Sequence, residues 1–227
     1  MTKERINNLK ARELIEGALK TVRNAQQLCD ESELLYQHKM FARSYALSHL
    51  AREEIGKSAM LFKVAIDCLL GNQIDWKKVD RRFRSHKEKI MNDRALTFLL
   101  FGHMKAEGRK LDPNVLFNSG TVEYMNARKN ASIYVDWIEG KFISPEESVS
   151  EQQSARNLDL AIYRVALMSK VIPSLVELEQ KSKDEIAKIF PMKKIIQFAE
   201  DLQDEINSSQ DNQVAPSASG RRLRDNS

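Results

Sequence analysis

Residues 42–70, ARSYALSHLAREEIGKSAMLFKVAIDCLL, predict one long helix around which the rest of the chain is organised. At about 100° per residue, the residues within about 60° of Leu47 form a core-facing, largely apolar stripe. They are Leu50, Ala51, Ser58, Leu61, Phe62, Ala65 and Leu69. Glu54 lies near the middle of this stripe, where a carboxylate is costly unless it is paired. We therefore predict a cationic partner for Glu54. Lys57, one helical turn onward, is the nearest candidate, and exposure of Glu54 to solvent is the alternative.

The composition fits one helical domain. The chain has 227 residues, of which 42% are hydrophobic and 30% charged, with 8 Gly and 5 Pro. This length is enough to bury a substantial core. Cys29 and Cys68 lie in helical, partly apolar contexts, so we expect reduced thiols. Because no apolar run approaches the roughly 20 residues that span a bilayer and no signal-peptide core is evident, we expect a cytoplasmic protein without membrane contact.

Helical periodicity continues on both sides of the central stretch. Residues 8–36 predict a first helix, which should form an antiparallel hairpin with 42–70. Gly71 is typical of a helix C-terminus, and Asp75 is a candidate N-cap for a third helix that runs to about residue 101. Further helices are predicted over residues 121–137, from 150 onward, and over 183–206 with a break near Pro191.

These elements predict an all-α fold, since strand-like alternation is lacking. A capping box at Ser144-Pro145-Glu146-Glu147 marks another helix start. We expect one helical domain over residues 1–207. Residues 208–227, SSQDNQVAPSASGRRLRDNS, are polar with almost no large apolar side chains, and predict a disordered C-terminal tail.

The predicted third helix is strongly basic. Residues 77–94 carry eight Lys or Arg and three acidic residues, a local charge of +5 in a chain whose net charge is +4. Such a face can hold phosphates, or it can be an ordinary solvated surface.

Motifs for metal or nucleotide cofactors are absent. The sequence has no Gly-rich phosphate loop, CxxC, HExxH or GxSxG, and its four histidines, at 38, 49, 86 and 103, lack metal-ligand spacing. We therefore expect no metal and no cofactor. His49 and His86 are each candidates for a hydrogen-bonded histidine at a helix interface or for a site residue. Gly56 is expected to admit a close neighbour helix or a dimer partner.

Three blocks of the chain resemble the AbiV family of bacterial abortive-infection proteins. They are the EEIGKS core of residues 45–61, the spacing of Trp76, Phe83, His86 and Lys89, and residues 127–147, ARKNASIYVDWIEGKFISPEE. AbiV proteins are placed within the wider HEPN group of helical domains. The resemblance implies a HEPN-like helical bundle with additional C-terminal helices.

The resemblance also implies a role in antiphage defence. Active HEPN nucleases are similar in carrying an arginine followed a few residues later by a histidine, and they cut RNA without a metal in a site formed across a dimer. An arginine fork can neutralise charge on a phosphate, while a histidine of near-neutral pKa can move protons. The implied partners are RNA, a second copy of the chain and a phage-encoded protein trigger.

The segment that matches the HEPN motif begins at Arg128 but holds Tyr134 in the place of the histidine. A phenol with an ordinary pKa near 10 is a poor base at pH 7, although it can orient a phosphate or act as an acid. Arg81 with His86 meets the same spacing on the third helix. We therefore predict Arg128, Tyr134 and His86 as catalytic candidates.

The remaining candidate residues surround these three. The predicted RNA contacts are Lys77, Lys78, Arg81, Arg82 and Arg84. The predicted supporting residues are Glu54, Lys57, Asn130 and Asp136. Arg128 is the second candidate partner for Glu54, because its guanidinium could fork onto a buried carboxylate.

Two functions stay open at this point. One is a toxin that cleaves RNA or acts on the translation machinery, without a metal. The other is a non-catalytic module that senses a phage protein or occludes RNA. The tyrosine at position 134 favours the module, whereas the basic third helix fits either function.

Overall fold

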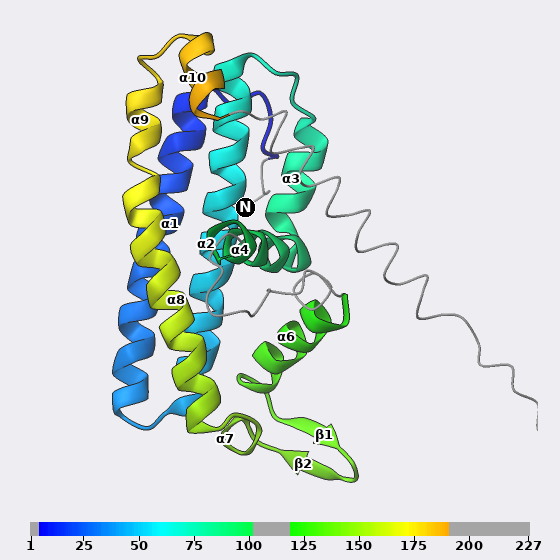
Figure 1. The fold of residues 1–227 in the computed structure, drawn as a ribbon. Helices are drawn as coiled ribbons and strands as arrows, with labels where there is room; N and C mark the ends of the chain where they lie inside the picture. The colour runs from blue at the N-terminus through cyan, green and yellow to red at the C-terminus, as the bar shows by residue number, and fades with distance from the viewer. Residues whose placement is uncertain (1–4, 102–118, 191–227) are drawn as a thin grey trace, which may run out of the picture. The chain divides into compact units, whose positions relative to one another are not determined.

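A helical hairpin forms the centre of the fold (Figure 1). The computed structural model describes residues 5–101 and 119–190, with the backbone alone at 96–101 and 119. Helix α1 (Ala11–Gln37) packs along helix α2 (Phe41–Leu70), and Gly71 ends α2 in the left-handed conformation, with φ +77°. The predicted first two helices and the glycine cap are confirmed.

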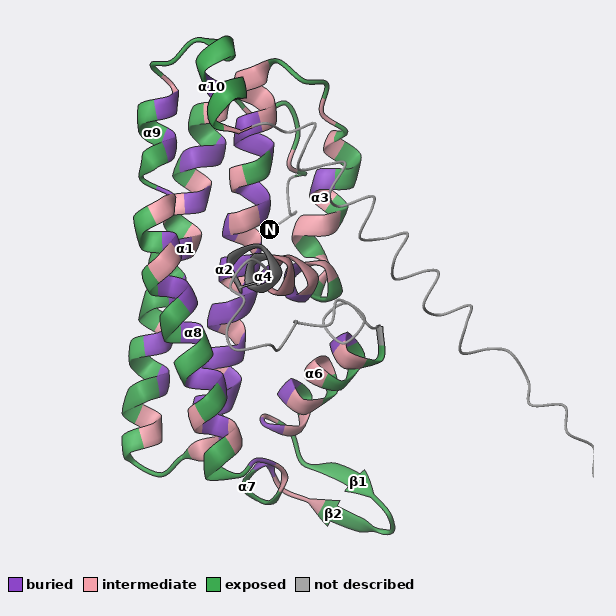
Figure 2. Ribbon diagram, viewed as in Figure 1, coloured by how far each residue is buried: buried purple, intermediate pink, exposed green. Residues whose placement is uncertain are grey.

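Helix α2 is buried on most of its circumference, because three neighbours cover it. Helix α1, helix α4 (His86–Phe101) and helix α8 (Glu151–Val171) all pack against it. Figure 2 shows buried residues along much of its length. Buried polar side chains such as His49, Arg52 and Glu53 therefore lie outside the single apolar stripe that the sequence predicts.

The predicted third helix is two helices, which corrects the prediction of one continuous element. Helix α3 (Trp76–Arg84) begins with the predicted cap, since the Asp75 carboxylate accepts a hydrogen bond from Lys78 N at 3.0 Å. Ser85 then adopts an extended conformation, and its hydroxyl accepts from Glu88 N at the start of α4. Serine is a strong N-cap, so it restarts the helix in a new direction. Figure 1 shows α4 nearly end-on beside an upright α3.

The predicted helix over residues 121–137 also ends early. Helix α6 spans Ser119–Ala131, and an antiparallel hairpin of β1 (Asp136–Ile138) and β2 (Lys141–Ile143) follows. The turn is Glu139-Gly140, where both residues have positive φ, the backbone that two-residue hairpins favour. The expectation of no strands is wrong at this hairpin. The other described elements are helices, so the all-α class is confirmed.

The chain then returns along the bundle. Helix α7 (Pro145–Ser148) begins with the predicted capping box, and α8, α9 (Ser174–Leu178) and α10 (Lys183–Ile189) follow. The predicted boundary at residue 207 and the tail lie outside the described residues. Cys29 and Cys68 are free thiols, as predicted. None of the described helices is long and apolar enough to cross a membrane.

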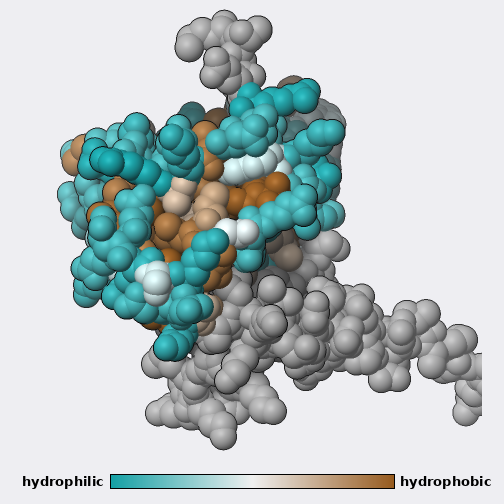
Figure 3. Space-filling view, turned by 90° about the horizontal axis from the view of Figure 1, so that it is seen from above, coloured by the Kyte–Doolittle hydropathy of each residue, from teal (hydrophilic) through white to brown (hydrophobic). Residues whose placement is uncertain are grey.

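Helix α10 contributes apolar contacts at one end of the bundle. Ile186 is buried, and the ring of Phe190 packs edge-on against Phe62 of α2, with centroids 5.7 Å apart. Seen from this end, apolar side chains gather between the helices inside a border of hydrophilic ones (Figure 3). The additional C-terminal helices thus share the core of the central hairpin.

Gly56 is the point where α2 admits the backbone of α4. A Cβ at this position would overlap the carbonyl of Lys89, so the close neighbour is a helix of the same chain. We expect Gly56→Ala to lower the free energy of unfolding by about 2–3 kcal/mol, because a backbone must shift. Urea denaturation measures this change.

Gly17→Ala is the matched control for this prediction. Its Cβ would meet only the end of the Leu61 side chain, at 3.3 Å, and alanine in a helix interior is favoured over glycine by up to about 1 kcal/mol. Equal stability of the Gly17 and Gly56 variants would contradict the prediction.

Candidate functional site: an arginine-lined cleft

An open cleft of about 380 Å³ is lined by residues of α2, α4, α6 and α8. Its lining residues are Tyr45, Arg52, Arg94, Thr121, Tyr124, Met125, Arg128, Gln153, Arg156, Asn157 and Leu160. Four of them are arginines, and no acidic residue occurs among the described residues of this lining. Guanidinium groups bind phosphate and carboxylate oxygens in a forked geometry. The cleft is therefore suited to an anionic ligand.

Arg128 is held in place at one wall of the cleft. Its Nη1 donates to the carbonyl of Ser148 at 2.7 Å and to Gln153 Oε1 at 3.1 Å. Its Nη2 donates to the hydroxyl of Tyr124 at 2.5 Å, and the guanidinium lies 5.2 Å from the centre of the Tyr124 ring. The arginine that the sequence singled out therefore lines the cleft, and hydrogen bonds within the chain fix its guanidinium.

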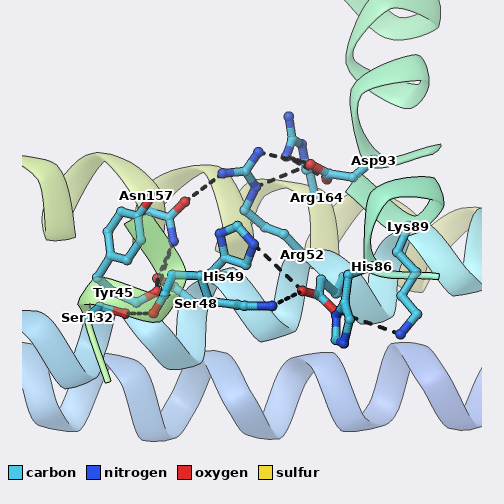
Figure 4. A network of polar contacts seen from close by, with 12 residues as sticks. Tyr45, Ser48, His49, Arg52, His86, Lys89, Asp93, Ser132, Asn157 and Arg164 are labelled. Carbon is cyan, nitrogen blue, oxygen red and sulfur yellow. Dashed lines mark hydrogen bonds and ion pairs between the residues drawn. The ribbon is translucent and has the colours of Figure 1, made fainter. Parts of the chain in front are cut away.

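Arg52 joins the cleft to a buried polar network (Figure 4). Its Nη2 donates to Asp93 Oδ2 at 2.9 Å, and its Nη1 donates to Asn157 Oδ1 at 2.6 Å. Arg164 also donates to both oxygens of Asp93. Burial lowers the pKa of Arg164 to about 10, with the neighbouring Asp93 charge opposing that shift. One carboxylate from α4 thus fixes arginines from α2 and α8.

Asn157 also ties α8 to α2. Its amide nitrogen donates to Ser48 Oγ at 2.6 Å and to the carbonyl of Tyr45 at 3.3 Å. With its oxygen engaged by Arg52, both ends of the amide are used. The lining residue Tyr45 is therefore held by the same network that orients Arg52.

The fully buried carboxylate of the EEIGK segment is Glu53, whereas the sequence prediction favoured Glu54. Glu53 is 3% exposed and lies 2.6 Å from His86 Nδ1 and 3.1 Å from Lys129 Nζ. Glu54 is partly buried and pairs with Lys57. Of the two candidate partners, Lys57 is the one that donates a hydrogen bond to Glu54. Arg128 lines the cleft instead.

Two further groups complete the surroundings of Glu53. Lys89 Nζ lies 3.8 Å from Oε2, and His49 Nε2 lies 3.7 Å from Oε1. Burial is the largest cause that lowers the pKa of Lys89, followed by the charge of Lys57. Figure 4 shows His49 between Arg52 on one side and His86 on the other.

The other sequence candidates lie elsewhere. Tyr134 is 64% exposed between α6 and β1, and Asn130 and Asp136 are exposed as well. None of these three lines the cleft, and neither does His86. Their predicted roles stay predictions.

The predicted RNA-contacting residues form a basic face that is partly neutralised within the chain. Arg84 pairs with Asp80 at 2.9 Å, and Arg82 pairs with Glu88 at 3.0 Å. Lys77, Lys78 and Arg81 are exposed on α3. Contact of this face with RNA remains a prediction.

Sequence reasoning missed most of the cleft. Arg52, Arg94 and Arg156 lie on three helices and share no motif with Arg128. A signal existed only for Arg52, which stands directly before the EEIGK segment. The described residues contain no cluster of three or more His, Cys, Asp or Glu with the geometry of a metal site.

Comparison with known protein families gives a match over most of the chain. The HEPN family model described as AbiV matches residues 13–165, which include α2, α4 and α6 and most of α1 and α8. No curated protein and no solved structure matches the chain. The matched range contains every residue that lines the cleft and more than half of the chain. The chain therefore belongs to the AbiV family, and is an abortive-infection-type HEPN protein.

Proposed function

We propose that the protein acts as an abortive-infection toxin in the bacterial cytoplasm, by binding RNA in the arginine-lined cleft and cleaving it without a metal ion. The observation that carries this proposal is the presence of four arginines, Arg52, Arg94, Arg128 and Arg156, among the residues of one cleft. A phosphodiester backbone supplies the repeated negative charge that such a lining attracts.

The dimensions of the cleft favour unpaired RNA. A volume of about 380 Å³ lies at the low end of the roughly 300–1,000 Å³ usual for small-ligand sites, and so suits about one nucleotide. Tyr45, Tyr124 and Met125 offer aromatic and apolar surface beside the arginines. Bases of single-stranded RNA stack on such side chains, whereas bases inside a duplex are not available to them.

The proposed reaction is an internal phosphoryl transfer. The 2′-hydroxyl loses its proton to a base on the protein and attacks the adjacent phosphorus. The bond from phosphorus to the 5′-oxygen breaks, that oxygen leaves with the bonding pair and takes a proton, and a 2′,3′-cyclic phosphate remains. Arg128 and its neighbours neutralise the charge that develops on the phosphate. The sequence candidates for moving protons are His86 and Tyr134, which lie outside the lining of the cleft.

Arg128 and Arg156 test the proposal. We expect Arg128→Ala and Arg156→Ala each to weaken binding of single-stranded RNA at least about 10-fold, since a charge-assisted hydrogen bond contributes about 1.5–3 kcal/mol. Arg23→Ala, at an exposed position of α1, is the matched control. Binding is measured by fluorescence anisotropy, and cleavage is measured on total RNA with EDTA present.

The outcomes separate the candidate functions. Cleavage by the wild-type protein that falls in both cleft variants supports the ribonuclease. Unchanged binding and cleavage in both variants would show that the cleft is not the RNA site. RNA or protein binding without cleavage supports the non-catalytic module.

One observation favours the module as a second candidate. The rings of Trp137 and Phe142 pack 4.7 Å apart on the β1–β2 hairpin, and their side chains are 59% and 71% exposed. Large exposed aromatic side chains are typical of protein-binding surfaces. In this function the hairpin would contact a phage protein trigger or a second copy of the chain.

The hairpin can be tested separately from the cleft. We expect Trp137→Ser with Phe142→Ser to abolish protection against phage in cells while leaving RNA binding unchanged, if the hairpin is the sensing surface. Full protection by this double variant would contradict the sensing role.

A further inference from the structure

Gln153 lines the cleft from the first turn of α8, and its side-chain oxygen is fully engaged. Oε1 accepts a hydrogen bond from Arg128 Nη1 at 3.1 Å and another from Ser150 N at 3.0 Å. An amide oxygen has two lone pairs, so these two bonds use its accepting capacity. The bond from Ser150 is half of the capping box that starts the helix, since Gln153 N donates to Ser150 Oγ at 3.3 Å.

The same two bonds determine which end of the amide remains for a ligand. Both partners are N–H donors, so the atom that meets them must be the oxygen, because a reversed amide would set its own N–H groups against them. The amide nitrogen, Nε2, has no hydrogen bond among the described residues. Gln153 therefore offers the cleft a donor and no acceptor.

The other side chains of the lining share this bias toward donors. The four arginines have no acceptor at all. Asn157 has its oxygen bonded to Arg52 and its nitrogen bonded to Ser48 and Tyr45. Among the described lining residues, the strong acceptors that remain on side chains are hydroxyl groups, which can donate as well. A ligand that presents acceptors matches this lining better than one that presents amino groups.

The RNA bases differ in this respect. Guanine and uracil carry a carbonyl oxygen, O6 or O4, at the position where adenine and cytosine carry an amino group. Arginine commonly bonds guanine at O6 and N7, because both atoms accept. An amino group opposite Gln153 Nε2 would set two donors against each other, and a polar group left without a partner weakens binding.

We infer that Gln153 makes the cleft selective for RNA bases that carry this carbonyl oxygen, guanine and uracil, over adenine and cytosine. The inference rests on the proposed binding of RNA in the cleft, and it names the class of nucleotide bound there. Because Gln153 is hydrogen-bonded to Arg128, a base that contacts Nε2 lies beside the guanidinium that binds the phosphate.

Binding of short RNAs to the full-length protein tests this selectivity. The probes are adenosine oligonucleotides in which one central nucleotide is uridine, cytidine, guanosine or adenosine. Comparing uridine with cytidine, and guanosine with adenosine, keeps the ring size constant, so that stacking differs little. We expect the carbonyl base to bind about 10-fold more tightly in at least one of these comparisons, by fluorescence anisotropy. The two comparisons then show whether uracil, guanine or both are selected.

Gln153→Glu should remove or reverse the preference. Glutamate keeps the capping box and can accept the same bond from Arg128, so the start of α8 is retained. Its second oxygen presents an acceptor to the cleft where Nε2 presented a donor. We expect the ratio of the two affinities to fall by at least about 10-fold.

Gln152→Glu is the matched control for this variant. Gln152 is exposed in the same turn and is not among the described residues of the lining. It adds the same charge to the helix start, so any general loss of RNA affinity should appear in both variants. The ratio between carbonyl and amino bases should stay at the wild-type value in Gln152→Glu.

The inference and the proposed function fail in different ways. If RNA affinity falls in Arg128→Ala while the wild-type protein binds the four RNAs equally or prefers amino bases, the cleft binds RNA and the inference is wrong. A wild-type ratio in Gln153→Glu would also overturn it. If Arg128→Ala and Arg156→Ala both leave RNA affinity unchanged, the cleft is not the RNA site, and the proposed function and this inference are both wrong.

Discussion

Replacing Asp93 with asparagine is expected to lower the free energy of unfolding by about 3–5 kcal/mol, the cost usual for breaking a buried ion pair. Asp93 is 1% exposed and accepts hydrogen bonds from Arg52 and Arg164, which are themselves buried. A neutral amide would remove the negative charge that these two buried guanidinium groups share. Urea denaturation at pH 7 measures the change.

Asp159→Asn is the matched control, because Asp159 is exposed on α8. It should change the free energy of unfolding by less than about 0.5 kcal/mol, as surface substitutions usually do. Similar stabilities of the two variants would contradict the role given to Asp93. Because Asp93 also orients Arg52, RNA affinity should fall in the Asp93 variant at temperatures where it remains folded.

Acidification from pH 7 to pH 4 is expected to destabilise the protein by about 3 kcal/mol through His49 alone. The pKa of this imidazole is lowered from 6.5 to about 3, chiefly by burial and in smaller part by the charges of Arg52, Lys129 and His86. The unfolded chain takes up a proton at His49 below pH 6.5, whereas the folded chain does not until about pH 3. The contribution of His49 to the free energy of unfolding is therefore fully present above pH 6.5. It is lost progressively as the pH falls toward 3.

His49→Gln isolates this contribution. Neither ring nitrogen of His49 has a hydrogen-bond partner among the described residues, so glutamine removes the titration without breaking a bond. The free energy of unfolding of the variant should depend less steeply on pH between 6.5 and 4 than that of the wild type. His38→Gln, at an exposed position, should follow the wild type. Parallel curves for the His49 variant and the wild type would refute the assignment.

Features that depend on neighbouring residues in the sequence were predictable. Helical periodicity predicts the hairpin of α1 and α2. Capping residues near the helix ends predict the Gly71 terminus, the Asp75 cap and the Ser144 capping box. The break at Ser85 was missed because the apolar spacing continues across it. At this position the hydrogen bond from Glu88 N to the Ser85 hydroxyl starts a new helix, although the apolar periodicity favours a continuous one.

The hairpin of β1 and β2 was missed for a different reason. Its strands have three residues each and are too short to show alternation, and only the Glu139-Gly140 turn was visible. Local pattern therefore predicted the turn but not the strands on either side of it.

The sequence by itself determined that the EEIGK helix lies in the core and that a carboxylate on it needs a partner, and the family resemblance made Arg128 a candidate site residue. Only the tertiary structure decided that the buried carboxylate is Glu53, that His86 and Lys129 bind it, and that Arg128 faces a cleft. The physical reason is that periodicity reports the angle of a side chain about its own helix axis. It does not report which neighbours cover each face, and α2 is covered by α1, α4 and α8 together.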